Sequence, residues 1–386
     1  MTPSARFQAA IEILDLIIVA ARDGGTSADK VAGDWLKARR FVGSKDRRAI
    51  RDLVWRTVRA YGNAPVSGRA AVLGLGDAEI EGLFDGGPHA PAPVAAGEAR
   101  AQRHALPDWM ERPDWLDEVE AAALLERAPL DIRVNPLRAG VDDVVAAFPD
   151  ALPIAGLPNA MRLRETPDIA RHPLFLSGAF EVQDAGSQHV ARIADARPGE
   201  TVIDLCAGGG GKTLALAADM GGAGRLIACD TSRARIAPLM PRAERAGAGF
   251  VETRLLDPGR ESGALTDLQG QADLVLVDAP CSGSGTWRRS PDLRWRLTRD
   301  RLARIVDQQA HILGVARALV RPGGRLVYAV CSFIDAEGAE QMQALDGGFV
   351  PEVRSDVGRA RGSGRTLTPF HDGTDGFFIA SLRRSC

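Results

Sequence analysis

Apolar residues recur at two different periods along this chain, and the change of period divides it. In residues 1–62 they recur every three or four positions, as Ile11, Leu14 and Ile18 do, which is typical of amphipathic helices. From Gly199 onward, short apolar runs alternate with helical or loop sequence. These runs are TVIDLC, RLIACD, FVETRLLD, DLVLVDAP and RLVYAVCS. Such alternation predicts a parallel sheet with helices on both of its faces.

Another predicted helix near the N-terminus is strongly basic. In GSKDRRAIRDLVWRTVRAYG, the residues Ile50, Leu53, Val54 and Val58 share one face and the arginines lie largely elsewhere. Residues 1–62 carry 12 Lys and Arg against 7 Asp and Glu, whereas residues 63–131 carry 5 Arg against 13 Asp and Glu. This asymmetry is compatible with a basic face on one domain, and equally with an ordinary solvated surface.

Composition also marks the expected domain boundaries. The stretch GGPHAPAPVAAGEARA is typical of a flexible connector, and near Pro129 the sequence LDIRVNPLRAGVDDVVAAF changes to strand, turn and helix. We therefore predict a helical domain over 1–125 with a connector near 63–105. An α+β subdomain is predicted over 126–178 and an α/β domain over 179–386.

The totals exclude some classes of protein. The 386 residues carry a net charge of −2, with 45% hydrophobic and 25% charged residues, which is ordinary for a soluble globular protein. No run of 18 apolar residues is present, and Glu12 and Asp15 interrupt the first apolar stretch, so we predict neither a membrane span nor a signal peptide. The five cysteines include no CxxC pair. Reduced thiols, no metal and a cytoplasmic location are the predictions.

The segment DLCAGGGGKT, residues 204–213, resembles a phosphate-binding loop at first sight. A nucleotide-binding loop of the form GxxxxGK[ST] requires glycine five positions before Gly211, where this chain has Cys206. The GxGxxG frame fails as well, because Thr213 or Leu214 occupies its third glycine position. An ATPase therefore remains only a weak alternative, supported by the strand that ends at Asp278. Four consecutive glycines at a helix start suit a ligand carboxylate as well as a phosphate.

Acidic residues end the next two predicted strands. Asp230 lies 19 residues after Gly211, where a carboxylate can accept hydrogen bonds from both ribose hydroxyls. Asp257 follows the third strand, where an acid can reach an adenine amino group. A ribose, an adenine and an amino-acid carboxylate together describe S-adenosylmethionine, although Asp230 alone is also explained as a strand-end cap.

Two cysteines follow the last two apolar runs. Cys281, with Asp278, lies just beyond the fourth strand, and Cys331 ends the fifth. Since ligands bind at the carboxyl ends of parallel strands, both thiols are expected to face the cofactor crevice. The other cysteines, Cys206, Cys229 and Cys386, are taken by default as small packing residues.

These motifs carry a family resemblance. DLCAGGGGK, DAPCSGSGTWRRSPD and YAVCS, in that order, resemble motifs I, IV and VI of the RsmB/NOL1/NOP2/Sun family of RNA cytosine-5 methyltransferases. RVNPL, FEVQDAGSQ and GTDGFFIASL are similar to flanking regions of the family, and the N-terminus resembles, more loosely, the NusB-like domain of the bacterial Sun branch. Two residues depart from the pattern: Gly209 stands where the family usually has proline, and Val330 where it has threonine.

The resemblance implies a fold and a reaction. The fold is a Rossmann-like class I methyltransferase with a mostly parallel seven-stranded sheet and an all-α NusB-like N-terminal domain. The reaction is methyl transfer from S-adenosylmethionine to C5 of a cytosine in RNA, through a covalent bond between Cys331 and C6. Cys281 assists release of the C5 proton, and Asp278 hydrogen-bonds the cytosine edge or, if protonated, assists at N3. Lys212 supports the cofactor loop or the catalytic geometry, with a purely structural role left open.

The predicted site follows from these roles. The catalytic residues are Cys331, Cys281, Asp278 and Lys212. The cofactor-binding residues are Cys206, Ala207, Gly208, Gly209, Gly210, Gly211, Lys212, Asp230, Arg235, Asp257 and Asp278. Arginines interleaved with tryptophans after motif IV suit RNA phosphates and bases, and we assign RNA contact to Arg288, Arg289 and Arg294.

The expected partner is RNA. Small-subunit (16S) ribosomal RNA is the first expectation, on the Sun-like architecture alone, and the chain is expected to act as a monomer. A tRNA cytosine-5 methyltransferase is the nearest alternative. A non-catalytic RNA-binding factor of ribosome assembly is another, and the presence of both Cys281 and Cys331 argues against it.

Overall fold

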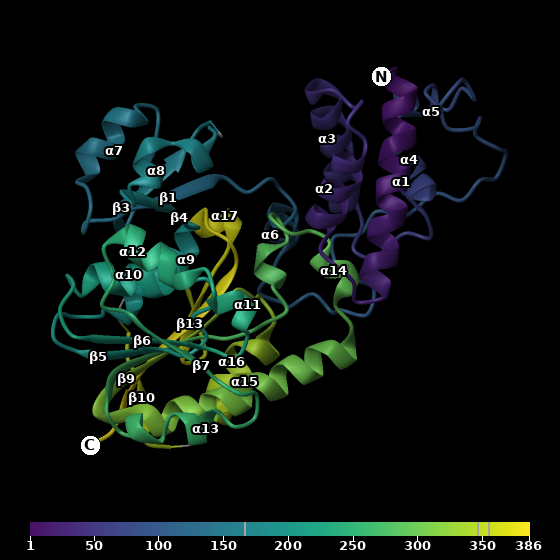
Figure 1. Cartoon of the computed structure of the whole chain (residues 1–386). Helices are drawn as coiled ribbons and strands as arrows, with labels where there is room; N and C mark the ends of the chain where they lie inside the picture. Colours follow the sequence, from purple (N-terminus) through teal and green to yellow (C-terminus); the bar gives the residue numbers. More distant parts are fainter. Residues whose placement is uncertain (166, 346, 354–355) are drawn as a thin grey trace. The chain divides into compact units, whose positions relative to one another are not determined.

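The computed structural model describes residues 1–165, 167–345, 347–353 and 356–386. It divides into two compact units, and each draws on two separate segments of the chain (Figure 1). One unit comprises Met1–Arg127 with Thr286–Leu302, and the other comprises Ala128–Gly285 with Ala303–Cys386. The described part of the chain contains no helix long and apolar enough to cross a membrane.

The first unit is helical. Its helices are α1 (Pro3–Arg22), α2 (Ala28–Ala38), α3 (Ser44–Ala60), α4 (Gly68–Leu73), α5 (Ala78–Glu81), α6 (Glu118–Ala123) and α14 (Leu293–Arg296). Thr2 caps α1 by accepting a hydrogen bond from the Ala5 amide, and Pro3 opens the helix. The apolar faces predicted for the first and third helices are the faces that are buried, and they form one core with Trp35 and Trp295.

The stretch near 63–105 differs from the predicted connector. It contains α4 and α5, and Val72, Leu73, Leu75, Ile80 and Phe84 are buried in the helical core. An ion pair between Arg69 and Glu98 and a backbone bond from Ala101 to Ala70 join its two ends. Frequent Gly, Pro and Ala lower helical propensity, but these large apolar side chains are numerous enough to pack the segment.

The second unit contains two sheets. The smaller is antiparallel and has the order β2 (Leu152–Ile154), β3 (Leu157–Leu163), β1 (Leu130–Val134) and β4 (Phe180–Val182), with helices α7 (Val141–Ala147) and α8 (Pro173–Leu176) in the same segment. It packs a small core around Ile132, Val144 and Phe180.

The larger sheet carries the candidate site. Its order is β11 (Arg359–Arg361), β12 (Gly364–Leu367), β13 (Phe377–Arg384), β9 (Val320–Val330), β8 (Ala272–Asp278), β5 (Thr201–Asp204), β6 (Arg225–Asp230) and β7 (Glu252–Leu255), and β10 (Phe349–Pro351) pairs with β13. Neighbouring strands are parallel in the order β9, β8, β5, β6 and β7. The pairs of β13 with β9, β10 and β12, and of β11 with β12, are antiparallel. Among the described residues this sheet has nine strands, with as many antiparallel as parallel pairings, whereas the prediction was a mostly parallel sheet of seven strands. Its shortest strands, β10 and β11, have three residues each, too few to show an alternating pattern.

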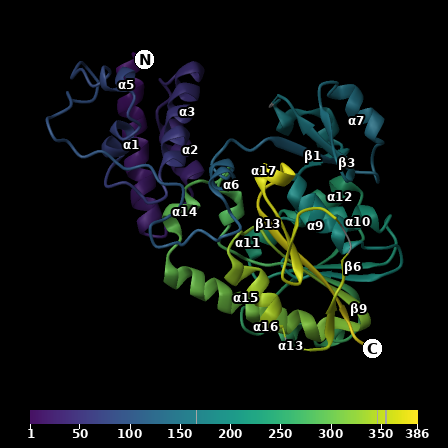
Figure 2. The same cartoon turned by 180° about the vertical axis from the view of Figure 1, so that it is seen from behind.

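Helices cover both faces of this sheet (Figures 1 and 2). On one face lie α9 (Ala185–Ala194), α10 (Gly211–Asp219) and α12 (Leu239–Ala246), and on the other lie α13 (Glu261–Ala264), α15 (Arg299–Leu319) and α16 (Ala339–Ala344). Adjacent residues of β5 point to opposite faces of the sheet: Val202 belongs to the hydrophobic core on the first face and Ile203 to the core on the second. Strands that are buried on both faces appear in the sequence as continuous apolar runs, which is how they were predicted.

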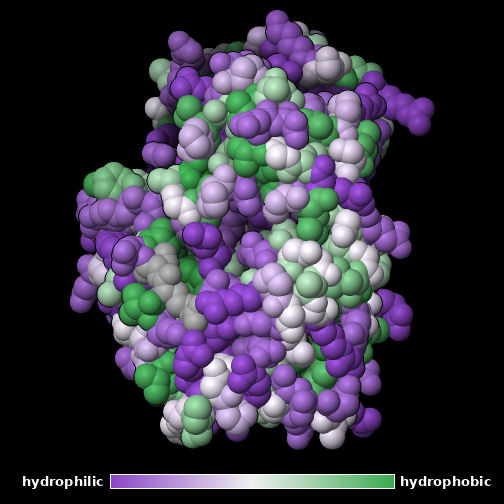
Figure 3. Space-filling view, turned by 90° about the vertical axis from the view of Figure 1, so that its left-hand side faces the viewer, coloured by the Kyte–Doolittle hydropathy of each residue, from purple (hydrophilic) through white to green (hydrophobic). Residues whose placement is uncertain are grey.

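On the side of the molecule drawn in Figure 3, hydrophobic residues are scattered among hydrophilic ones. Large apolar side chains that are exposed include Val145, Leu152 and Leu176. Single exposed apolar residues are normal on a protein surface.

Candidate active site

The glycine loop connects β5 to α10 and is built to let a ligand approach the backbone. Gly208 and Gly210 have φ of +51° and +85°, a region that favours glycine. A Cβ on Gly210 would lie 2.8 Å from the Leu239 side chain, and one on Gly208 would lie 2.9 Å from the Arg235 guanidinium. Conformation therefore favours glycine at both positions, and at Gly210 the buried Leu239 side chain leaves no space for a Cβ as well.

Asp230 holds this loop in place. It ends β6, is 3% exposed, and accepts hydrogen bonds from the Gly208 amide at 2.8 Å and from the Ser232 amide at 2.7 Å. The Arg235 guanidinium lies 3.7 Å from its Oδ2. A carboxylate at this strand end, beside glycine amides, is the arrangement expected for a ribose-binding acid.

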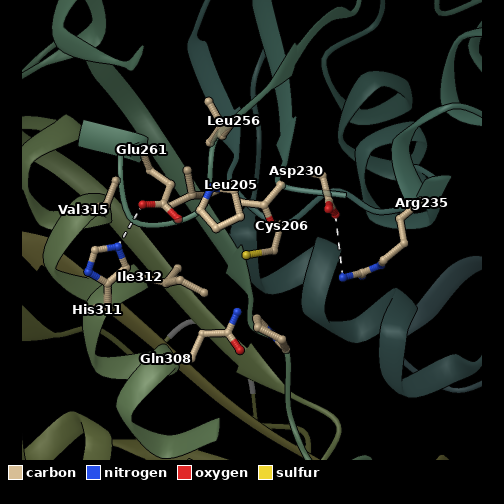
Figure 4. Close-up of a pocket in the computed structure, with 13 residues that line it drawn as sticks. Leu205, Cys206, Asp230, Arg235, Leu256, Glu261, Gln308, His311, Ile312 and Val315 are labelled. Atoms are coloured by element: carbon tan, nitrogen blue, oxygen red, sulfur yellow. Dashed lines mark hydrogen bonds and ion pairs between the residues drawn. The ribbon is translucent and has the colours of Figure 1, made fainter. Parts of the chain in front are cut away.

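A cavity of about 140 Å³ opens beside the loop (Figure 4). Figure 4 shows Asp230 with Arg235 on one side, the hydrogen-bonded pair Glu261 and His311 on the other, and Cys206 between them. The lining residues are Leu205, Cys206, Asp230, Thr231, Arg235, Leu256, Pro258, Glu261, Pro280, Gln308, His311, Ile312 and Val315. An apolar wall with a few polar groups at its ends suits a flat base joined to a sugar.

The predicted cofactor residues fall into two groups. Cys206, Asp230 and Arg235 line the cavity, while Ala207 and the four glycines form the adjoining loop. Asp257 is exposed and lies between two lining residues, Leu256 and Pro258. The sequence did not point to Glu261 and His311, which are 2.9 Å apart and come from α13 and α15. Nothing in their local sequence marks them, because only the tertiary packing of two helices brings them together.

The two motif cysteines meet at neighbouring strand ends. β8 and β9 are parallel, with Asp278 opposite Ala329, so the residues that follow both strands emerge at one edge. The Sγ atoms of Cys281 and Cys331 are 3.3 Å apart. The hydrogen bond to Cys331, burial and the nearby charge of Cys331 together raise the pKa of Cys281 well above its ordinary value. Either sulfur can be the donor of this contact.

Lys212 and Asp278 form an ion pair beside these thiols. The Lys212 Nζ lies 2.7 Å from Asp278 Oδ2 and 5.4 Å from the centre of the Phe377 ring. Burial opposes the ammonium form, but the charge and hydrogen bond of Asp278 and the neighbouring Cys331 raise the pKa of Lys212 overall. The Lys212 ammonium is therefore held beside Asp278 and near the Cys331 sulfur.

The remaining cysteines lie apart from this pair. Burial and the surrounding carboxylates raise the pKa of Cys206, and burial raises that of Cys229 to about 12, so neither is activated. Val330, the departure from threonine, is fully buried in the core with Tyr328, where a hydroxyl has no role. Gly209, the departure from proline, accepts a hydrogen bond from Arg242 through its carbonyl.

The arginines after motif IV belong to the helical unit. Arg294 is 1% exposed, and its guanidinium donates to the carbonyls of Val58, Arg59, Ala105 and Pro291. Burial lowers the pKa of Arg294 to about 9. Its predicted RNA contact conflicts with this burial, because its donors are already used to join segments of one unit. Arg288 is also buried, whereas Arg289 is partly exposed.

No group of three or more His, Cys, Asp or Glu that could hold a metal ion occurs among the described residues. The glycine loop, the strand-end carboxylate and the apolar cavity on a mixed sheet indicate a methyltransferase that uses S-adenosylmethionine.

Comparison with known proteins identifies the family. Residues 191–383 match the family described as 16S rRNA methyltransferase RsmB/F. The "Probable ribosomal RNA small subunit methyltransferase B" of Synechocystis is 34% identical over 307 residues, covering 74% of this chain and 68% of that protein. The "Ribosomal RNA small subunit methyltransferase B" of Xylella fastidiosa is 31% identical over 393 residues, covering 88% and 92%. The chain therefore belongs to the 16S rRNA methyltransferase RsmB/F family, as the motifs predicted.

Solved structures agree on the fold. A "Methyltransferase Homolog Protein" from Pyrococcus horikoshii is 27% identical with a TM-score of 0.60, covering 69% of this chain and 89% of that one. The crystal structure of PH0851 has a TM-score of 0.79 at 22% identity and covers 100% of this chain and 99% of that one. The second likeness concerns the fold alone and includes the helical N-terminal part.

Proposed function

We propose that the protein methylates C5 of a cytosine in small-subunit ribosomal RNA through a covalent bond between Cys331 and C6 of the base. The observation that carries the proposal is the 3.3 Å separation of Cys281 Sγ and Cys331 Sγ at adjacent strand ends, beside a buried ammonium. The ribosomal substrate is supported by the names of the relatives, and RNA C5 chemistry by the pair of thiols.

We give the residues the roles that the family resemblance implies, and this geometry supports them. The Cys331 thiolate forms a bond to C6, and this makes C5 a nucleophile because the ring loses its aromatic conjugation. Asp278 Oδ2 accepts from Lys212, so we assign its other oxygen to the cytosine 4-amino group. When bound, S-adenosylmethionine supplies the electrophilic methyl group. Asp230, Arg235 and the glycine loop would hold it.

Cys281 is assigned to the release of the product. After methylation, C5 carries a hydrogen that must leave as a proton before the bond between C6 and Cys331 Sγ can break. The Cys281 Sγ lies 3.3 Å from the Cys331 Sγ, on the same edge of the sheet. In its thiolate form Cys281 accepts this proton, directly or through one water molecule, and becomes a thiol, while the electrons of the C5–H bond restore the C5–C6 double bond and expel the Cys331 thiolate from C6.

We also propose that the helical unit is a NusB-like module that contacts RNA. On α3, the side chains of Arg48 and Arg51 are exposed. Arg289 is retained as an RNA contact. Exposed arginines on one helix face suit the phosphate backbone and do not by themselves select a sequence.

The test is to trap the intermediate. Cys281→Ala is expressed in cells and purified under denaturing conditions, and any attached RNA is sequenced, with Cys331→Ala and the double variant as controls. We expect 16S rRNA on the single Cys281 variant and none on the other two. Attached tRNA would select the tRNA alternative. No adduct, with S-adenosylmethionine binding intact, would contradict the covalent mechanism and favour the non-catalytic assembly factor.

A further inference from the structure

Glu337 is a fully buried carboxylate to which the mechanism above gives no role. It lies in a 3₁₀ turn, η4 (Asp335–Glu337), that follows β9. Its Oε1 accepts from the Ser282 amide at 2.7 Å and from Gln309 Nε2 at 3.1 Å. Its Oε2 accepts from the hydroxyls of Ser282 and Ser332, each at 2.5 Å. Four donors satisfy both oxygens, as a buried carboxylate requires.

These donors come from the two turns that carry the reactive thiols. Ser282 directly follows Cys281, and Ser332 directly follows Cys331. One carboxylate therefore bonds to the neighbour of each cysteine. The hydroxyls of Ser284 and Ser332, 2.9 Å apart, form a second link between the same two turns.

The two turns depend on Glu337 to different degrees. Cys331 follows directly on the β9 ladder, whose last residue Val330 pairs with Phe378, and the Cys331 carbonyl accepts from the Gly285 amide. Cys281 lies three residues beyond the end of β8, in a turn whose Ser282 amide donates to Glu337 rather than to another strand. Loss of the carboxylate should therefore displace Cys281 more than Cys331.

We propose that Glu337 is a positioning residue that holds Cys281 against Cys331 and so sets the rate of product release. This inference rests on the proposed function, and specifically on the division of roles between the two thiols. When Glu337 is removed, Cys331 should still add to the base, but proton removal from C5 should slow. The covalent adduct between protein and RNA should then accumulate.

The experiment compares Glu337→Ala and Glu337→Gln with wild type and Cys281→Ala, all full-length and expressed in the same cells. The fraction of denatured protein that carries RNA is measured for each. We expect Glu337→Ala to raise this fraction at least about tenfold over wild type, toward the Cys281→Ala value. Glutamine keeps the shape and one acceptor oxygen, so Glu337→Gln should lie between them.

Asp335→Asn is the matched control. Asp335 belongs to the same turn, but its carboxylate pairs with Arg361 and, within the described residues, bonds to neither serine. Its adduct fraction should equal that of wild type. The dissociation constant for S-adenosylmethionine and the melting temperature are measured on every variant, and a purely structural role for Glu337 would change these without accumulating adduct.

Two serine variants keep the test decisive if Glu337→Ala does not fold. Ser282→Ala removes the hydroxyl donor of the Cys281 turn and should raise the adduct fraction more than Ser332→Ala does. Equal effects, or adduct on Cys281→Ala with none on folded Glu337 or Ser282 variants, would overturn the inference. Absence of adduct on Cys281→Ala itself would instead contradict the proposed function.

Discussion

Replacement of Asp204 by asparagine should remove a specific pH dependence of stability from the second unit. Asp204 ends β5 beneath the glycine loop and is fully buried. The Thr213 hydroxyl donates to its Oδ2 at 2.7 Å, and among the described residues its Oδ1 has no hydrogen-bond partner. Burial raises the pKa of Asp204 from 3.8 to about 7, although the Thr213 hydrogen bond opposes the shift.

The sign follows from proton linkage. Between pH 4 and 7 the folded protein keeps the Asp204 proton, whereas the unfolded chain has released it. The free energy of unfolding therefore falls as pH rises through this window, by about 1.4 kcal/mol per pH unit for one group. From the ordinary pKa of 3.8 to about 7 the total is on the order of 4 kcal/mol. Asparagine resembles the protonated acid and has no such dependence.

The assay is hydrogen exchange of peptides that contain β5, measured by mass spectrometry in increasing urea at pH 5, 6 and 7. From pH 5 to 7, the unfolding free energy of Asp204→Asn should rise by about 2–3 kcal/mol relative to that of wild type. Thr213→Val removes the opposing hydrogen bond and should extend the window to higher pH. Parallel pH curves for Asp204→Asn and wild type would refute the reasoning.

Three further predictions concern the loop, the cofactor and the helical unit. Gly210→Ala places a Cβ 2.8 Å from Leu239 at φ +85° and should destabilise the second unit by about 1–3 kcal/mol in urea unfolding, while Gly211→Ala, with no atom within 4 Å, should cost far less. Asp230→Asn should weaken S-adenosylmethionine binding about 10- to 100-fold by calorimetry, because a charged acceptor is lost, and an unchanged affinity would exclude the ribose role. Arg294→Met should destabilise the helical unit by about 3–5 kcal/mol, since several buried carbonyls lose their donor. All six tryptophans lie in that unit, so tryptophan fluorescence measures its unfolding. If Arg294→Met weakened RNA binding without lowering stability, the predicted RNA contact of Arg294 would be supported after all.

The sheet and the edge that carries the two motif cysteines were predictable because both depend on the order of residues close together in the sequence. Strands buried on two faces appear as continuous apolar runs, and the rule that parallel strand ends share one edge is enough to bring Asp278, Cys281 and Cys331 together. The helix faces of the first unit were predictable for the same reason, since a period of 3.6 requires only neighbours in sequence.

Burial of charged residues was not predictable in this way. Arg294 is basic and lies beside tryptophans, which is the local pattern of an RNA contact. Its actual partners are carbonyls about 190 and 235 residues away along the chain. Glu337 and the pair Glu261 and His311 were missed for the converse reason, because their importance arises only where separate elements converge. Charge is a local property of a sequence, whereas its solvent exposure is not.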